Sequence, residues 1–205
     1  MKYALYVLGL LPVIIFIWFS QNLESSAVLS FDEYFAELLF GNSFIQLFHY
    51  IGDTIFVMIV TAILIIYFAW RHKNYRASVF ILLTIAGGTI VNQFFKHYFE
   101  RPRPEIANQL DSFSFPSGHS MLGILYLLTI AYLFGKLAMK KSIKIWLWTI
   151  CTLLFVLIGM SRVAEARHYA SDVISGWSLG LFWLTICIVW YELKSKQSNK
   201  KTAFK

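Results

Sequence analysis

The sequence predicts an all-α integral membrane protein, a bundle of six transmembrane helices. Apolar residues make up 58% of its 205 residues and charged residues only 14%, against roughly 25% charged residues in an ordinary soluble domain. A helix of roughly 20 uncharged residues crosses the ~30 Å hydrocarbon core of a bilayer. Six uncharged runs reach or approach that length, namely residues 3–19, 54–70, 77–95, 120–135, 145–161 and 173–191.

The first run has one feature of a secretory signal, because Lys2 precedes it. It is longer than a usual signal core, however, and no A-x-A-like cleavage site follows it at residues 20–24. We therefore expect a retained first helix. Cys151 and Cys187 each lie inside an apolar run, which favours buried hydrophobic side chains over a disulfide or a metal pair.

The distribution of charge orients the bundle. With the N-terminus in the cytoplasm, thirteen of the eighteen Lys and Arg residues fall on the cytoplasmic side and ten of the eleven acids on the other, Glu192 being the exception. The positive-inside rule thus predicts cytoplasmic termini for a plasma-membrane protein. We expect one domain over residues 1–193 and a basic tail over residues 194–205. The net charge of +7 serves topology and lipid contact, so it does not indicate nucleic acid binding.

A short amphipathic helix is predicted between the first two spans. Residues 31, 34, 35, 38 and 39 are apolar at helical spacing, Ser30 and Glu33 form a capping-box pattern, and Gly41 is a plausible terminator. A second apolar piece follows at residues 43–51. We expect the helix to lie in the outer interface. It either packs over the mouth of the bundle or is a surface helix with no part in chemistry.

Five cations lie on the outer side, against the positive-inside trend: Lys96, Arg101, Arg103, Arg162 and Arg167. Three of them fall within the eight residues 96–103, a segment that Pro102 and Pro104 stiffen. A lone lysine at the end of a span is usually a snorkelling anchor, but such a cluster needs another explanation.

The fourth span opens on the outer side with Pro116, Ser117, Gly118 and His119. Proline is preorganised for a first helical turn, and the free N–H groups at a helix start attract an anion. Gly118 permits close approach of a phosphate, the Ser117 hydroxyl can donate, and His119 can transfer a proton. Alone, these four residues also fit a simple capped turn.

His168 and Asp172 stand four residues apart between the last two spans, on one helical face and on the same side of the membrane. The carboxylate can fix the tautomer of the imidazole and leave its other nitrogen as a nucleophile or base. Such pairs are often structural. Here, cations and helix N–H groups nearby suit the three equatorial oxygens of a transferring phosphoryl group. His119 suits protonation of the leaving oxygen. Because up to five cations repel a divalent metal, we predict phosphoryl transfer without a metal or other cofactor.

Three sets of residues carry a family resemblance. In chain order, Lys96 with Arg103–Pro104, the segment Pro116–His119, and Ser161–Arg162 with His168 and Asp172 resemble the signature motifs of the type 2 phosphatidic acid phosphatase superfamily at every defining position. The resemblance covers essentially the whole chain. Its spans are similar to the integral-membrane lipid phosphatases rather than to the soluble acid phosphatases or vanadium haloperoxidases. Its small size resembles the bacterial phosphatidylglycerophosphatase B type.

This resemblance implies a mechanism. His168 would attack phosphorus to give a phosphohistidine, Asp172 would orient it, and His119 would protonate the leaving alkoxide and then activate water. The implied phosphate-binding residues are Lys96, Arg103, Ser117, Gly118 and Arg162. Arg101 and Arg167 match no defining position, and they either bind an anionic headgroup or a second phosphate or are solvated loop charges. We expect solvated side chains for Glu100, Glu105, Asp111 and Glu165, and no catalytic role for His49, His72 and His97.

The motifs leave the substrate open, because they contact only phosphoryl oxygens. Phosphatidylglycerol phosphate is favoured on the resemblance, and undecaprenyl diphosphate and phosphatidic acid remain alternatives. We expect this lipid to arrive from the bilayer, with no obligate protein partner. Outside the enzyme class, a transporter of anionic lipid remains possible, although it would place its site near mid-membrane, where this sequence has no charge.

Overall fold

The computed structural model describes the backbone of residues 2–203 and the side chains of residues 9–195. All regular elements in this part of the chain are helical, and residues 100–117 form its longest loop. Its elements are α1 (Lys2–Gln21), α2 (Ser26–Leu39), α3 (Ser43–Gln46), α4 (His49–Gly52), α5 (Thr54–Ile66), η1 (Tyr67–Arg71), α6 (Tyr75–Leu82), η2 (Leu83–Gly87), α7 (Gly88–Phe99), α8 (Gly118–Leu137), α9 (Lys141–Ala164) and α10 (Ala170–Ala203), where η marks a π-helical turn.

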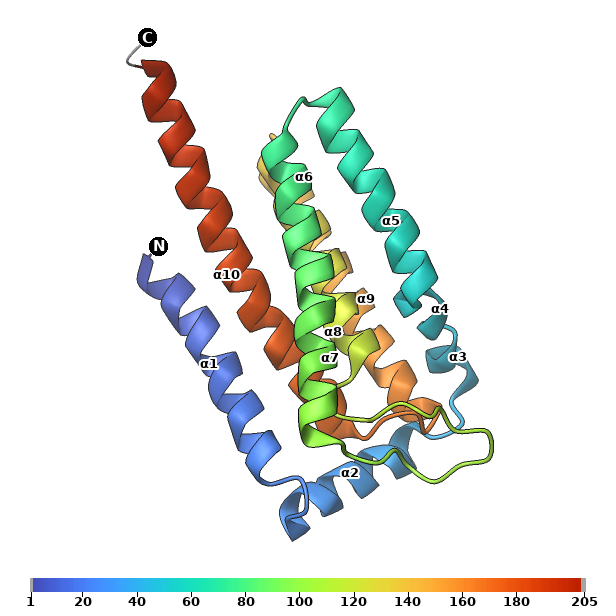
Figure 1. Ribbon diagram of the computed structural model, residues 1–205. Helices are drawn as coiled ribbons and strands as arrows, with labels where there is room; N and C mark the ends of the chain where they lie inside the picture. Colours follow the sequence, from blue (N-terminus) through green and yellow to red (C-terminus); the bar gives the residue numbers. More distant parts are fainter. Residues whose placement is uncertain (1, 204–205) are drawn as a thin grey trace.

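The bundle has five to six candidate membrane spans among the described residues. Five helical segments are long and apolar enough by themselves: Thr54–Arg71, Tyr75–Phe99, Gly118–Leu137, Lys141–Ala164 and Ala170–Ser195. They confirm five of the predicted runs. The first run forms α1, which packs along α10 (Figure 1). The segment Gly9–Gln21 of α1 is long and apolar enough for a span only when it is counted together with Ser26–Leu39. A bend of 102° separates these two segments.

Helix α2 crosses the end of the bundle, the arrangement predicted for a short helix between the first two spans (Figure 1). The predicted capping box is wrong, because the helix begins at Ser26 and Ser25 is its N-cap, with the Ser25 Oγ accepting from the Val28 N–H at 3.4 Å. Ser30 therefore lies inside the helix. The predicted terminator is confirmed, since Gly41 adopts a φ of 73°, which glycine tolerates without strain. The predicted piece at residues 43–51 forms the two short helices α3 and α4.

Helix α8 runs through the middle of the molecule and contacts α9, α10 and α7. Most of its side chains are buried, including Met121, Ile124 and Leu125. A Cβ at Gly176 of α10 would lie 2.6 Å from the Ser117 carbonyl oxygen. Glycine at this position therefore allows α10 to approach the start of α8 closely, which brings two of the predicted motifs together.

The motifs meet at the end of the bundle that α2 covers, and the N-terminal end of α1 and the C-terminal end of α10 lie at the other end (Figure 1). Helix α10 continues to Ala203 without a break at the predicted domain boundary after residue 193. The side chains of the predicted basic tail beyond residue 195 lie outside the described residues.

Candidate active site

The three motifs converge on one cavity of about 240 Å³. Its lining includes six of the eight residues predicted for the site, namely Lys96, Arg103, Gly118, His119, Arg162 and His168. Ser117 and Asp172 are fully buried behind the cavity wall. The Ser117 N–H donates to the Asp172 carbonyl oxygen at 3.0 Å, a main-chain bond that fixes the start of α8 against α10.

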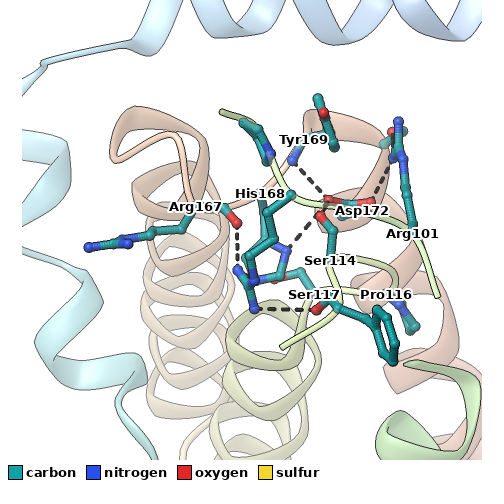
Figure 2. Close-up of polar contacts among 12 residues, drawn as sticks. Arg101, Ser114, Pro116, Ser117, Arg167, His168, Tyr169 and Asp172 are labelled. Atoms are coloured by element: carbon teal, nitrogen blue, oxygen red, sulfur yellow. Dashed lines mark hydrogen bonds and ion pairs between the residues drawn. The ribbon is translucent and has the colours of Figure 1, made fainter. Parts of the chain in front are cut away.

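His168 and Asp172 face each other, as predicted (Figure 2), although His168 lies in a bend before α10 begins at Ala170 and not on the expected helix face. The His168 Nδ1 lies 3.5 Å from the Asp172 Oδ2, a long distance for a hydrogen bond, and Nδ1 has no closer polar partner among the described residues. Arg103 donates to the other ring nitrogen, with 3.1 Å between Nη1 and Nε2. The guanidinium is only a donor, so Nε2 carries a lone pair and the ring proton belongs on Nδ1, toward Asp172.

The protonation state of His168 follows from its burial. Burial lowers the pKa of His168 from 6.5 to about 3; the bond and charge of Asp172 oppose this, and the cations Lys96 and Arg103 add to it. His168 is therefore neutral at physiological pH, and the lone pair of its Nε2 is available without deprotonation.

This shift of pKa gives a testable pH dependence of stability. Because the folded pKa lies below the unfolded value, the unfolded chain binds more protons at His168 between about pH 6.5 and pH 3, and stability falls as pH falls through that window. We expect the apparent melting temperature in detergent to drop more between about pH 7 and pH 5 for the wild type than for His168→Asn, which lacks the titrating group. Equal drops would contradict the neutral, buried state of His168.

Three cations, Lys96, Arg103 and Arg162, line the cavity. Main-chain carbonyl groups of the loop before α8 accept hydrogen bonds from two of them. Arg103 donates to the Ser112 carbonyl at 2.6 Å and the Arg167 carbonyl at 2.5 Å, and Lys96 donates to the Phe113 carbonyl. Burial and the nearby Arg162 lower the pKa of Arg103 to about 10, so that it stays charged at neutral pH. The loop thus presents charged donors beside the Nε2 atom.

The start of α8 closes the cavity from a second side. The Ser117 Oγ caps the helix by accepting from the Ser120 N–H at 3.4 Å and from the Ser120 hydroxyl at 2.9 Å, so its side chain does not face the cavity. A Cβ at Gly118 would lie 3.2 Å from the Asn92 Oδ1, which makes glycine the best fit there. Asn92 also donates to the Pro116 carbonyl at 3.3 Å, a supporting contact that the sequence did not reveal.

His119 lines the cavity opposite the loop, and the backbone of α4 packs against it. A Cβ at Gly52 would lie 3.5 Å from the His119 Cδ2. Because His119 and His168 share one cavity, a group bound there can contact both imidazoles. This arrangement suits a nucleophile with a separate acid or base.

Arg162, the third cation, belongs to a chain of polar contacts. Its Nη1 lies 2.6 Å from the Glu165 Oε2, and the Glu165 Oε1 lies 2.6 Å from the His49 Nδ1. The prediction that Glu165 is solvated is wrong, because its side chain is only 17% exposed. The expectation that His49 lacks an acid at helical spacing is wrong, because Asp53 follows it by four residues. The Asp53 carboxylate accepts from the Ile55 N–H at 2.8 Å, however, and His49 lies against Glu165.

The two arginines outside the motifs differ in their surroundings. Arg101 is only 9% exposed and contacts both Asp32 and Asp172, so it is not a solvated loop charge. Arg167 donates to the Asn108 carbonyl at 2.6 Å and to the Gln109 Oε1 at 3.1 Å; its side chain therefore fastens the loop and does not line the cavity. The sequence contained one indication that Asp32 faces the bundle, because it follows Val28 by four residues and so lies on the same face of the helix. Both residues are buried on the inner face of α2.

Comparisons with known proteins agree with the motifs. The family profile described as PAP2 superfamily matches residues 77–196. The chain is 35% identical over 127 residues to phosphatidylglycerophosphatase B of Bacillus subtilis (strain 168), which covers 60% of this chain and 62% of that protein. It is 26% identical over 137 residues to an undecaprenyl-diphosphatase of Sulfolobus acidocaldarius, covering 65% of this chain and 62% of that protein. The chain thus spans less than two thirds of the length of these relatives.

The fold is similar to a solved membrane enzyme. The crystal structure of a transmembrane PAP2 type phosphatidylglycerolphosphate phosphatase from Bacillus subtilis aligns with a TM-score of 0.79 and 28% identity. The alignment covers 88% of this chain and 96% of that one. The likeness therefore includes the bundle outside the profile match.

Proposed function

The chain belongs to the PAP2 superfamily and is a multi-pass membrane protein, and on that premise we propose that it is a metal-independent phosphatase of membrane lipids. We propose phosphatidylglycerol phosphate as its substrate, with the phosphomonoester hydrolysed to phosphatidylglycerol. The observation that carries the proposal is the lone pair of the His168 Nε2 beside a cavity lined by Lys96, Arg103 and Arg162, with His119 in the same lining.

In the proposed first step, the lone pair of the His168 Nε2 attacks phosphorus in line with the leaving oxygen. The N–P bond forms as the P–O bond breaks, and His119 gives a proton to the leaving alkoxide. Arg103 gives up its bond to Nε2 as the substrate binds and donates to a phosphoryl oxygen instead, which frees the lone pair for the attack. Lys96 and Arg162 bind the other developing negative charges, which is the largest contribution that such sites usually make.

In the second step, His119 takes a proton from water as the water oxygen attacks phosphorus. The N–P bond breaks, Nε2 recovers its lone pair, and inorganic phosphate leaves. Asp172 stabilises the positive charge on the phosphorylated imidazole through the Nδ1 proton. The main-chain N–H groups at the start of α8, where Ser117 caps the helix and Gly118 leaves space, supply neutral donors.

The shape of the cavity supports an amphiphilic substrate. Its lining includes Thr54 at the start of α5, Thr89 of α7 and Leu122 of α8, so it extends from the charged end into the spans. A cavity of about 240 Å³ accommodates a phosphorylated headgroup but not two acyl chains, which would stay in the bilayer. The positive-inside distribution supports an extracytoplasmic site in a single domain over residues 1–193, followed by a cytoplasmic basic tail.

The donor set supports chemistry without a metal. Among the described residues, no three His, Cys, Asp or Glu side chains are grouped so as to hold a metal ion, and three cations already occupy the cavity wall. We expect phosphate release by the purified protein to be unchanged by EDTA, within about twofold, because positive side chains perform the charge stabilisation. A requirement for an added divalent cation would contradict the proposal.

The same assay identifies the substrate. Phosphate release is compared for phosphatidylglycerol phosphate, undecaprenyl diphosphate and phosphatidic acid in detergent with EDTA present. We expect the highest kcat/KM for phosphatidylglycerol phosphate, the substrate named for the 35% identical relative. A preference for undecaprenyl diphosphate, named for the 26% identical relative, would replace the substrate but keep the chemistry. Absence of phosphate release from all three would favour lipid transport.

A further inference from the structure

Arg101 makes polar contacts to three side chains, all outside the lining of the catalytic cavity. Its Nη1 donates to the Asp172 Oδ1 at 2.7 Å and to the Ser171 Oγ at 2.8 Å, and its Nη2 donates to the Asp32 Oδ2 at 2.9 Å. The guanidinium also lies 4.1 Å from the ring centroid of Tyr169. Planar forked geometry of this kind lets arginine, unlike lysine, bind two carboxylates in fixed directions.

Asp32 anchors this arrangement from α2. It is buried, and its two oxygens accept from the Ser171 N–H and the Ser171 hydroxyl, both at 2.7 Å, as well as from Arg101. Burial of a carboxylate is costly unless it is paired and hydrogen-bonded. These bonds therefore attach the crossing helix α2 to the first turn of α10, where Asp172 lies.

The two oxygens of Asp172 have different partners. Oδ1 accepts from Arg101, whereas Oδ2 accepts from the Ser114 hydroxyl and from the Tyr169 N–H at 2.9 Å, and faces the His168 Nδ1 (Figure 2). Because both oxygens are hydrogen-bonded, rotation of the carboxylate away from the imidazole would break these bonds. Burial opposes the charge of Arg101, but the carboxylates of Asp172 and Asp32 raise its pKa above the ordinary value, so that Arg101 stays charged. We call Arg101 with its two carboxylate partners, Asp32 and Asp172, the clamp.

We propose that Arg101, held by Asp32 of α2, is a positioning residue that fixes the Asp172 carboxylate toward His168. Arg101 acts through Asp172 and touches no substrate, since it does not line the cavity. The role rests on the proposed phosphatase function. It also gives α2 a part in the chemistry, because α2 supplies the second carboxylate of the clamp.

The kinetic test compares Arg101→Gln, Arg101→Lys and Asp32→Asn with the wild type. We expect Arg101→Gln to lower kcat about 10–100-fold, the effect usual for groups that orient a reacting side chain, with KM changed by less than about twofold. Arg101→Lys should recover part of the loss, because one ammonium keeps the charge but not the fork. Asp32→Asn should lower kcat less than Arg101→Gln does, because Arg101 still reaches Asp172.

Arg167→Gln is the matched control, since it removes an arginine of the same region whose side chain, among the described residues, bonds to Asn108 and Gln109 and to neither Asp32 nor Asp172. We expect it to keep kcat within about threefold. A large rise in KM for Arg101→Gln with kcat unchanged would make Arg101 a substrate-binding residue and overturn the proposal. So would equal effects of Arg101→Gln and Arg167→Gln.

A second measurement does not need turnover and so separates this proposal from the proposed function. Melting temperatures in detergent are measured for Arg101→Gln, Asp172→Asn and the double variant. We expect coupling, with the double variant more stable than the sum of the single effects predicts, because each single change leaves a buried charge unpaired. Additive effects would overturn the clamp even if the enzyme is active. Coupling in a protein that releases no phosphate would uphold the clamp and reject the phosphatase.

Discussion

Replacing His168 with asparagine is expected to lower kcat for phosphate release by about 10⁴-fold or more, because the variant lacks the nucleophile proposed to form the covalent intermediate. The structure supports a large effect, since the His168 Nε2 is the buried, unprotonated nitrogen beside the cationic cavity wall. Two measurements check it: phosphate release, and trapping of an acid-labile phosphoprotein after rapid mixing with labelled substrate.

His97→Asn is the control, because His97 is exposed and bonds only to the Gln93 carbonyl, at 2.8 Å, among the described residues. We expect this variant to keep kcat within about twofold of the wild type and to form the phosphoprotein normally. Residual activity of His168→Asn within about tenfold of the wild type would show that water attacks phosphorus directly. In that case His168 would be a phosphate-binding residue.

The sequence predicted the parts of this molecule that depend on local patterns. Uncharged runs gave five of the helical spans because each helix satisfies its own backbone within one segment. The i, i+4 spacing correctly predicted the pairing of His168 with Asp172, but not its local structure, because His168 lies in a bend before α10 begins at Ala170 and not on a helix face. The predicted N-cap of α2 was wrong because the capping box at Ser30 and Glu33 indicated a later start, whereas Ser25 caps the helix with Val28 at the position that a capping box gives to Glu or Gln.

Contacts between distant segments could not be predicted in the same way. Arg101 and Asp32 are 69 residues apart, and neither segment contains a sequence pattern that predicts contact with the other. Their pairing depends on the 102° turn between α1 and α2, which places α2 across the ends of the spans. For the same reason Glu165 was expected in solvent, although α4 brings His49 against it. An acid on the inner face of an amphipathic helix was the one available signal.

His119 offers the second large effect, and it depends on the leaving group. With a lipid phosphate, whose leaving alkoxide needs a proton, His119→Asn is expected to lower kcat about 10²–10⁴-fold. With p-nitrophenyl phosphate the leaving phenolate needs no proton, so phosphorylation of His168 should be almost unaffected. Hydrolysis of the phosphohistidine should still be slow, because the variant has no base to activate water.

The expected result is therefore a burst of one nitrophenolate per enzyme in His119→Asn, followed by slow turnover and accumulation of the phosphoprotein. The double variant with His168→Asn should show neither burst nor phosphoprotein. The position of His119 in the same lining as His168 requires this pattern, since one imidazole must act as acid in the first step and as base in the second. Equal losses on both substrates, without accumulation, would reduce His119 to a residue that only shapes the cavity against α4.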